Sequence, residues 1–223
     1  MWTYRLIIIV LLLGCSPVHQ KSHLINSENS DMTTNQDLHF HKLTKINVIG
    51  DFDGDGKEDT IFQHNFSKLY NREIDSSADP LQSNWDNVIK WFYGQESDVY
   101  LTINHSSNDT LHLGTAQGLY CLLNIGDNNS DGKDEVAFVV DYCDYSQANN
   151  CKIYTLCKGK WNELQQYAVH EDAFAFSSDT SPRFKGIKGY LENRNGNWFY
   201  LDYDKDILKG NEKMTPLKLN KCK

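Results

Sequence analysis

The sequence predicts a mainly β fold, made of two antiparallel β-meander units, one inserted helix and a C-terminal hairpin. An acidic loop occurs twice, at residues 48–62 and 124–138. Runs of β-branched and aromatic residues flank both copies, which is typical of strands joined by a turn. Residues 79–93 differ, because their apolar residues recur at helical spacing. Four short antiparallel strands linked by turns have the shape of one propeller blade, so each unit is expected to be blade-like.

The chain begins with a segment that predicts export. Arg5 precedes a continuous apolar run at residues 6–13. This run is too short to span a bilayer, because a spanning helix needs roughly 20 residues. The sequence Leu-Leu-Gly-Cys that ends at Cys15 resembles the bacterial lipobox. The resemblance implies a lipoprotein signal peptide of residues 1–14 and lipidation of Cys15, and an ordinary secretory signal or an uncut anchor is the alternative.

The rest of the chain is expected to divide into a tether and one domain. Residues 15–38 hold the lipidated cysteine and a polar stretch, which predicts a flexible tether. Residues 39–223 are expected to form a single β-rich domain of ordinary size. We therefore expect a protein that is lipid-anchored to a membrane of the bacterial cell envelope, with the outer membrane as the expected one.

The first unit is expected to contain the helix. Asp79 is the expected N-cap, Pro80 suits the first helical position and Gly94 ends the apolar pattern. The first acidic loop joins two strands, and the helix separates them from a hairpin. The four expected strands are residues 44–50, 60–66, 98–104 and 110–113.

The second unit is expected to be an uninterrupted meander. Its acidic loop joins the first two strands, and a Lys-Gly-Lys turn at residues 158–160 precedes the last. The four expected strands are residues 119–125, 135–142, 152–157 and 161–170. Residues 183–203 then predict one more hairpin, with its turn at residues 193–196.

The six cysteines fit an oxidising compartment. Cys143 and Cys151 flank a polar stretch between two strand-like runs, which predicts a disulfide across the mouth of a hairpin. With Cys15 assigned to lipid, an odd number remains, so at least one cysteine is free or pairs with another chain. The pairing of three others stays open: Cys121, Cys157 and Cys222.

Composition and motifs argue against several classes of function. The formal net charge is −8 and no stripe of basic residues is present, so a nucleic-acid partner is not expected. The sequence contains no GxSxG, P-loop or HExxH motif, and its eight histidines are scattered. No catalytic residue is therefore predicted.

The two acidic loops indicate a calcium ligand set. Side-chain oxygens occur at loop positions 1, 3, 5 and 9, glycine occurs at position 6, and the carbonyl of position 7 can add another oxygen. A set of oxygen ligands alone suits calcium, whereas zinc or copper would need histidine or cysteine. The expected ligands are Asp51, Asp53, Asp55, Lys57 and Asp59 in the first loop, and Asp127, Asn129, Asp131, Lys133 and Glu135 in the second.

An EF-hand is the obvious alternative, but position 12 is Phe62 or Phe138 where an EF-hand needs an acidic residue. An Asp/Gly-rich turn without metal is a further alternative. The first loop carries four carboxylates and the second three, so the second site is expected to bind more weakly. Affinities of about 0.1–1 mM would suit extracellular calcium.

A DxDGDGxxD loop between two strands resembles the calcium loop of FG-GAP and VCBS-type repeats. The resemblance covers residues 48–62 and 124–138 with their flanking strands. It implies that the loop carboxylates bind calcium and that each repeat forms a four-stranded blade. Since the chain has two clear units and a closed propeller usually has at least four blades, an open pair of blades is expected.

These observations lead to three functional hypotheses. The first is a calcium-stabilised envelope lipoprotein that acts as a binding or scaffold module for an unknown protein or glycan ligand. The second is an envelope hydrolase, directed at glycans, in which calcium is structural. The third is an inhibitor or immunity-type lipoprotein that caps a partner protein.

Overall fold

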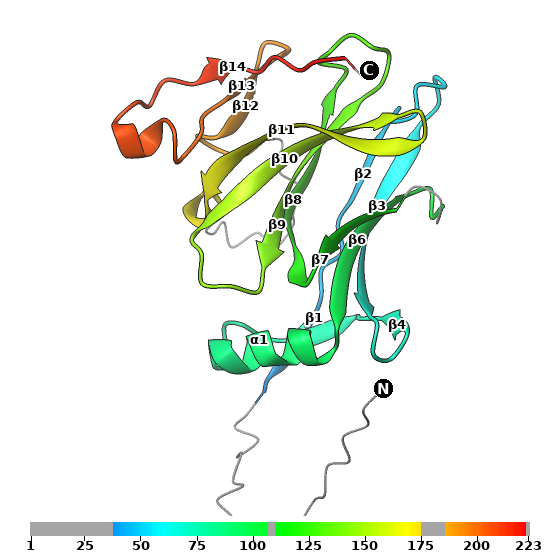
Figure 1. The fold of residues 1–223 in the computed structure, drawn as a ribbon, viewed down its shortest axis with the longest axis vertical. Coiled ribbons are helices and arrows are strands. Elements are labelled where there is room, and N and C mark those ends of the chain that lie inside the picture. The colour runs from blue at the N-terminus through cyan, green and yellow to red at the C-terminus, as the bar shows by residue number, and fades with distance from the viewer. Residues whose placement is uncertain (1–37, 107–109, 175–185, 222–223) are drawn as a thin grey trace, which may run out of the picture. The chain divides into compact units, whose positions relative to one another are not determined.

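The computed structural model of the protein describes residues 38–106, 110–174 and 186–221. Within these residues the fold is mainly β, with four antiparallel sheets and one α-helix (Figure 1). This confirms the predicted fold class, while the blade-like geometry stays a prediction. The predicted signal peptide, Cys15 and Cys222 lie outside the described residues. None of the helices described is long and apolar enough to cross a bilayer.

The first sheet has the predicted strand order β2-β3-β6-β7, with a short strand, β4, beside β3. The helix α1 lies in the chain between β5 and β6, as an insertion into this meander. A separate pair, β1 with β5, is an addition that the sequence did not predict. The bounds are β1 Phe40–Lys42, β2 Asn47–Gly50, β3 Asp59–Ser67, β4 Arg72–Glu73, β5 Ser76–Ala78, β6 Ser97–Ile103 and β7 Leu111–Gly114.

The second sheet is the predicted uninterrupted meander, β8-β9-β10-β11. Its strands are β8 Ala116–Gly126, β9 Glu135–Tyr142, β10 Ala148–Cys157 and β11 Lys160–His170. The two acidic hairpins have equivalent registers, because Gly50 pairs with Asp59 and Gly126 pairs with Glu135. The repeat in the sequence is therefore also a repeat in strand pairing.

Two hydrophobic clusters cover opposite faces of the second sheet. One cluster packs this sheet against the first, for example Phe138 with Ile61. The other packs it against the C-terminal segment, for example Ile153 with Trp198. Consequently β9 is buried along all but its last two residues, which explains its continuous apolar run.

The C-terminal hairpin is confirmed and carries a third strand. Its strands are β12 Leu191–Arg194, β13 Asn197–Tyr200 and β14 Thr215–Pro216, in that order. Two short 3-10 helices complete the described elements, η2 Glu171–Ala173 and η3 Ile207–Lys209.

The helix α1 spans Trp85–Gly94 and starts later than predicted. Its N-cap is Asn84, whose side chain accepts from the Asp86 N–H at 3.0 Å. Asp79 instead accepts from the Leu81 N–H at 2.8 Å, which fixes a turn before the helix. The apolar spacing therefore predicted the helix, but two competing Asx turns decided where it begins.

The predicted Cys143–Cys151 disulfide is not formed, since Cys121, Cys143 and Cys151 are buried free thiols. Cys151 pairs across the ladder with Val139, four residues before Cys143 in the chain. Four strand residues span about 13 Å, whereas the Cα atoms of a disulfide lie within roughly 7 Å. The two thiols accordingly belong to different hydrophobic clusters, with Cys143 beside α1.

Candidate metal centres

The first acidic loop, between β2 and β3, gathers three of its predicted ligands. Carboxylate oxygens of Asp51, Asp53 and Asp59 lie within 4.8 Å of one another. The N–H groups of Gly54 and Gly56 donate to the two oxygens of Asp51, at 2.9 and 3.0 Å. Gly56 has a φ of +81°, which favours glycine, so the chain can curl around Asp51.

Asp59 is the buried member of this cluster, at the first position of β3. The Asp53 N–H donates to its Oδ2 at 3.2 Å, and Asn104 Nδ2 donates to its Oδ1 at 2.6 Å. Asn104 also accepts from the Thr60 N–H at 2.8 Å, which ties the end of β6 to the loop. Sequence reasoning missed Asn104, because it lies 45 positions from Asp59.

The second loop, between β8 and β9, repeats this arrangement. Carboxylate oxygens of Asp127, Asp131 and Glu135 lie within 4.8 Å of one another. The N–H groups of Asp131 and Gly132 each donate to one oxygen of Asp127, at 3.0 Å. In both loops the residue at position 9 is buried and another member of the cluster is exposed, so each cluster is open to solvent on one side.

Glu135 provides the test of whether a cation fits this loop. The residue is 0 % exposed, and its Oε2 accepts from the Asn128 N–H at 2.7 Å. Its Oε1 has no hydrogen-bond partner among the described residues. Burial is the main cause that raises the pKa of Glu135 to about 7, and the neighbouring Asp131 and Asp127 add to it. A buried carboxylate oxygen without a donor, beside two further carboxylates, is what a hard cation satisfies.

Two predicted ligands of the first loop lie outside its cluster. Asp55 forms an ion pair with Lys57 at 2.9 Å and also accepts from the Lys57 N–H at 2.8 Å. These bonds lower the pKa of the Asp55 carboxyl. To join the cluster, Asp55 would have to leave this ion pair, so its place among the ligands and that of the Lys57 carbonyl stay predictions.

The matching positions of the second loop differ. Asn129 Oδ1 accepts from the Asp131 N–H at 2.9 Å, and its Nδ2 donates to Asp131 Oδ2 at 3.0 Å. The Lys133 ammonium donates to the Leu156 carbonyl at 2.8 Å and not to Asp131. Lys221, by contrast, donates to the Ser130 carbonyl of this loop at 2.6 Å. Position 5 thus joins the cluster in the second loop, through Asp131, but not in the first.

The two loops contact each other directly. The Asp51 N–H donates to Asp134 Oδ2 at 3.1 Å, and the Asp134 N–H donates to the Asp51 carbonyl at 2.8 Å. Asn124 donates to the same Asp134 oxygen at 2.7 Å and to the Ile49 carbonyl at 3.0 Å. A Cβ at Gly50 would collide with both Asn124 and Asp134.

Sequence reasoning missed this contact, although one feature of the repeat pointed to it. Asn124 stands where the first copy has Val48, so a polar residue replaces an apolar one in the strand before the loop. Such a break in an otherwise matching repeat marks a position with a different neighbour.

A second polar cluster lies on the outer face of the first sheet. Glu73 Oε1 contacts His64 Nδ1 at 3.0 Å, and His64 Nε2 contacts Thr102 Oγ1 at 3.0 Å. Lys45 donates to Glu73 at 2.8 Å, and the hydrogen bonds from Lys45 and His64 outweigh burial and lower the pKa of Glu73. His64 stacks on Tyr100 with ring centroids 4.7 Å apart.

No protein-family profile, curated protein sequence or solved structure matches the chain. The resemblance to FG-GAP and VCBS-type repeats therefore depends on the two loops and their flanking strands alone.

Proposed function

We propose that this protein is a calcium-binding β-rich module, held on the bacterial cell envelope by a lipid anchor and acting there as a binding or scaffold protein. The observation that carries the proposal is the pair of equivalent carboxylate clusters. Each has three carboxylates within 4.8 Å, in a hairpin of the same register. Glu135 adds a buried oxygen without a donor.

Electrostatics favours a cation in both clusters. Two carboxylate charges no more than 4.8 Å apart repel each other by roughly 3 kcal/mol or more at an effective dielectric constant of about 20. Backbone N–H groups relieve part of this repulsion in each loop. Bound calcium supplies two positive charges to oxygen ligands and so offsets the remainder.

Calcium titration calorimetry on residues 38–223 tests the proposal. This part is a suitable sample because it contains every described member of the three hydrophobic clusters. We expect two binding events, one lost in Asp51→Asn and the other in Asp127→Asn. Glu212→Gln removes one exposed charge outside both clusters and is the matched control. No binding at about 1 mM calcium, the weak end for extracellular modules, would mean that the loops are only turns.

The lipid anchor is a separate part of the proposal. Its support is the lipobox-like sequence that ends at Cys15. Metabolic labelling with a palmitate analogue should mark the full chain expressed in bacteria, and Cys15→Ser should abolish the label. An equal label on the variant would contradict the assignment of Cys15.

A second candidate function, an envelope hydrolase, has one observation in its favour. The His64 imidazole contacts the Glu73 carboxylate through one nitrogen and the Thr102 hydroxyl through the other. A carboxylate, an imidazole and a hydroxyl linked in this order resemble an activated nucleophile. Thr102 is only 5 % exposed, and Lys45 already binds Glu73, which favours a structural network. Hydrolysis of an ester or glycan substrate by the wild-type domain, lost in Thr102→Val, would favour the hydrolase. The absence of turnover on all of these substrates would favour the binding module.

A further inference from the structure

Exposed apolar side chains are concentrated on one part of the domain. Nine large hydrophobic residues are exposed in the described part of the chain. Six of them lie on β1 or just before it, on the β3–β4 turn, or on α1 and the segment before it. Leu81 is 87 % exposed, and the others are more than half exposed apart from Leu38 at 36 %. We call these six residues the apolar end: Leu38, Phe40, Leu69, Tyr70, Leu81 and Tyr93.

The segments that carry the apolar end contact one another. The Leu69 N–H donates to the Gln95 carbonyl at 3.3 Å, which joins the β3–β4 turn to the end of α1. The Phe40 and Trp91 rings lie 5.7 Å apart, which joins β1 to α1. Leu81 lies between α1 and β5, the partner strand of β1. Figure 1 shows α1, β1 and β4 grouped at one end of the domain, so the segments that carry the six exposed residues lie close together.

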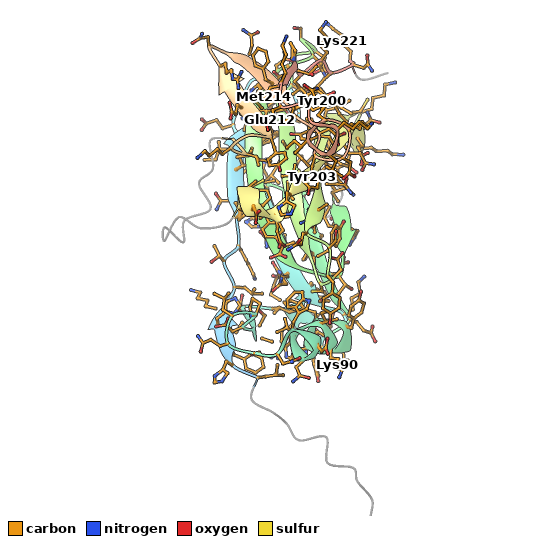
Figure 2. The ribbon with its side chains drawn as sticks, turned by 90° about the vertical axis from the view of Figure 1, so that its left-hand side faces the viewer. Lys90, Tyr200, Tyr203, Glu212, Met214 and Lys221 are labelled. Atoms are coloured by element: carbon orange, nitrogen blue, oxygen red, sulfur yellow. The ribbon has the colours of Figure 1, made fainter. Side chains whose placement is uncertain are left out.

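The acidic loops lie away from this surface. The first loop ends at Asp59 and the β3–β4 turn follows Ser67, so the length of β3 separates them. Eight residue steps along a strand span about 27 Å. In Figure 2, Lys90 on α1 lies far from Glu212 and Met214, which belong to the C-terminal segment.

The charge of the apolar end differs from that of the whole chain. Exposed basic and acidic residues nearly balance on its segments, whereas the chain carries a formal charge of −8. The basic residues are Lys42, Lys68, Arg72 and Lys90, and the acidic ones are Asp75, Asp86 and Glu96. An anionic surface would therefore not repel this end, as it would repel the acidic loops.

We propose that the apolar end docks on the lipid bilayer to which the chain is anchored. The inference rests on the lipid anchor of the proposed function. Leu38 belongs to the apolar end and is preceded by residues 16–37 and Cys15. Only these 22 residues separate Cys15 from Leu38, so an anchor at Cys15 would limit how far the apolar end can move from the membrane. Leucine, phenylalanine and tyrosine insert readily at the headgroup level.

Docking in this way would give the domain a fixed orientation. The acidic loops would then lie about 27 Å or more from the headgroups and would face away from the membrane. Calcium binding and partner contacts would take place on the outward side of the protein.

Flotation with vesicles tests the docking independently of the anchor. Residues 38–223, which lack Cys15, are mixed with vesicles of phosphatidylethanolamine and phosphatidylglycerol at a ratio of about 3:1. We expect the domain to float with the vesicles, and Leu81→Ser to lower the partition coefficient about fivefold to tenfold. Leu81→Ser with Tyr93→Ser should abolish flotation. Since the contact is apolar, 0.5 M salt, which screens charges beyond roughly 4 Å, should change little.

Leu208→Ser is the matched control, because Leu208 is 64 % exposed on η3 and lies outside the apolar end. Thermal melts confirm that all variants fold. Equal loss of flotation in Leu208→Ser and Leu81→Ser, no flotation of the wild-type domain, or release by salt would each overturn the proposal. If the wild-type domain is a dimer and Leu81→Ser is a monomer, the apolar end contacts a second copy of the chain and not the membrane, which also overturns the proposal. Failure of palmitate labelling would instead remove the anchor and leave the vesicle result to stand by itself.

Discussion

Removal of calcium should lower the melting temperature of residues 38–223 by an amount that the structure allows us to estimate. Two equivalent clusters imply two sites. With dissociation constants of about 0.1–1 mM, about 5 mM calcium stabilises the folded state by about 1–2 kcal/mol per site. The sum for two sites, about 2–5 kcal/mol, corresponds to about 5–15 °C for a domain of this size.

The assay is a thermal melt in 5 mM calcium and in excess chelator, followed by circular dichroism. Asp51→Asn should lose the larger part of the calcium-dependent shift and Asp127→Asn the smaller part, because the second site is expected to bind more weakly. Glu212→Gln should keep the whole shift. Magnesium should shift the melt less, because its octahedral shell at about 2.0–2.1 Å fits these loops poorly. Identical melts with calcium and with chelator would refute the reasoning from the carboxylate clusters.

Three further predictions follow from the contacts around the loops and from buried groups. Gly50→Ala should lower the free energy of unfolding in urea by about 1–3 kcal/mol, because the new Cβ would collide with the Asp134 side chain. Gly94→Ala is the control: its Cβ meets nothing within 4 Å, so the stability of the domain should stay the same or rise. Burial, aided by nearby carboxylates, raises the pKa of Asp141 to about 6 although a tyrosine and Gln117 donate to it. The folded state thus holds this proton more tightly than the unfolded chain does, so Asp141→Asn should gain up to about 3 kcal/mol at pH 7.5. The gain should shrink as the pH falls through about 6 and should vanish below about pH 3.5, under the ordinary pKa of an aspartate. An equal gain at pH 7.5 and pH 3.5 would contradict this reasoning. The three buried thiols should react with a thiol reagent only after unfolding, and reaction in the native state would place them at the surface: Cys121, Cys143 and Cys151.

The sequence predicted the architecture well where local pattern decides it. Both four-strand meanders have the expected order, and the helix interrupts the first one as expected. The beginning of α1 was wrong by several residues, because Asn84 competes with Asp79 as a cap and the apolar spacing does not distinguish between them. The β1–β5 pair was missed, since its short strands carry no alternating pattern of their own.

The candidate site shows the same division. The repeated loop identified Asp51, Asp59 and Glu135, and the structure places each of them in a three-carboxylate cluster. The repeated loop did not show that Asp55 forms an ion pair with Lys57 outside the cluster. The same turn allows the Asp55 side chain to point either to Lys57 or to the other carboxylates, so the loop sequence does not distinguish the two conformations. The Cys143–Cys151 pairing failed because it assumed a register that the β9–β10 ladder does not have.

The sequence by itself predicted the three-carboxylate cluster and the turn of each acidic loop, because nine neighbouring residues contain the carboxylates and the glycine at the bend. It also determined the strand order, since short connections leave few alternatives. Only the tertiary structure decided that the loops meet through Asp51 and Asp134, which are 83 positions apart. Only it showed that six of the exposed apolar residues lie on segments at the same end of the domain. Such contacts depend on how whole sheets pack, and the packing is decided by the summed burial of many residues rather than by any local pattern.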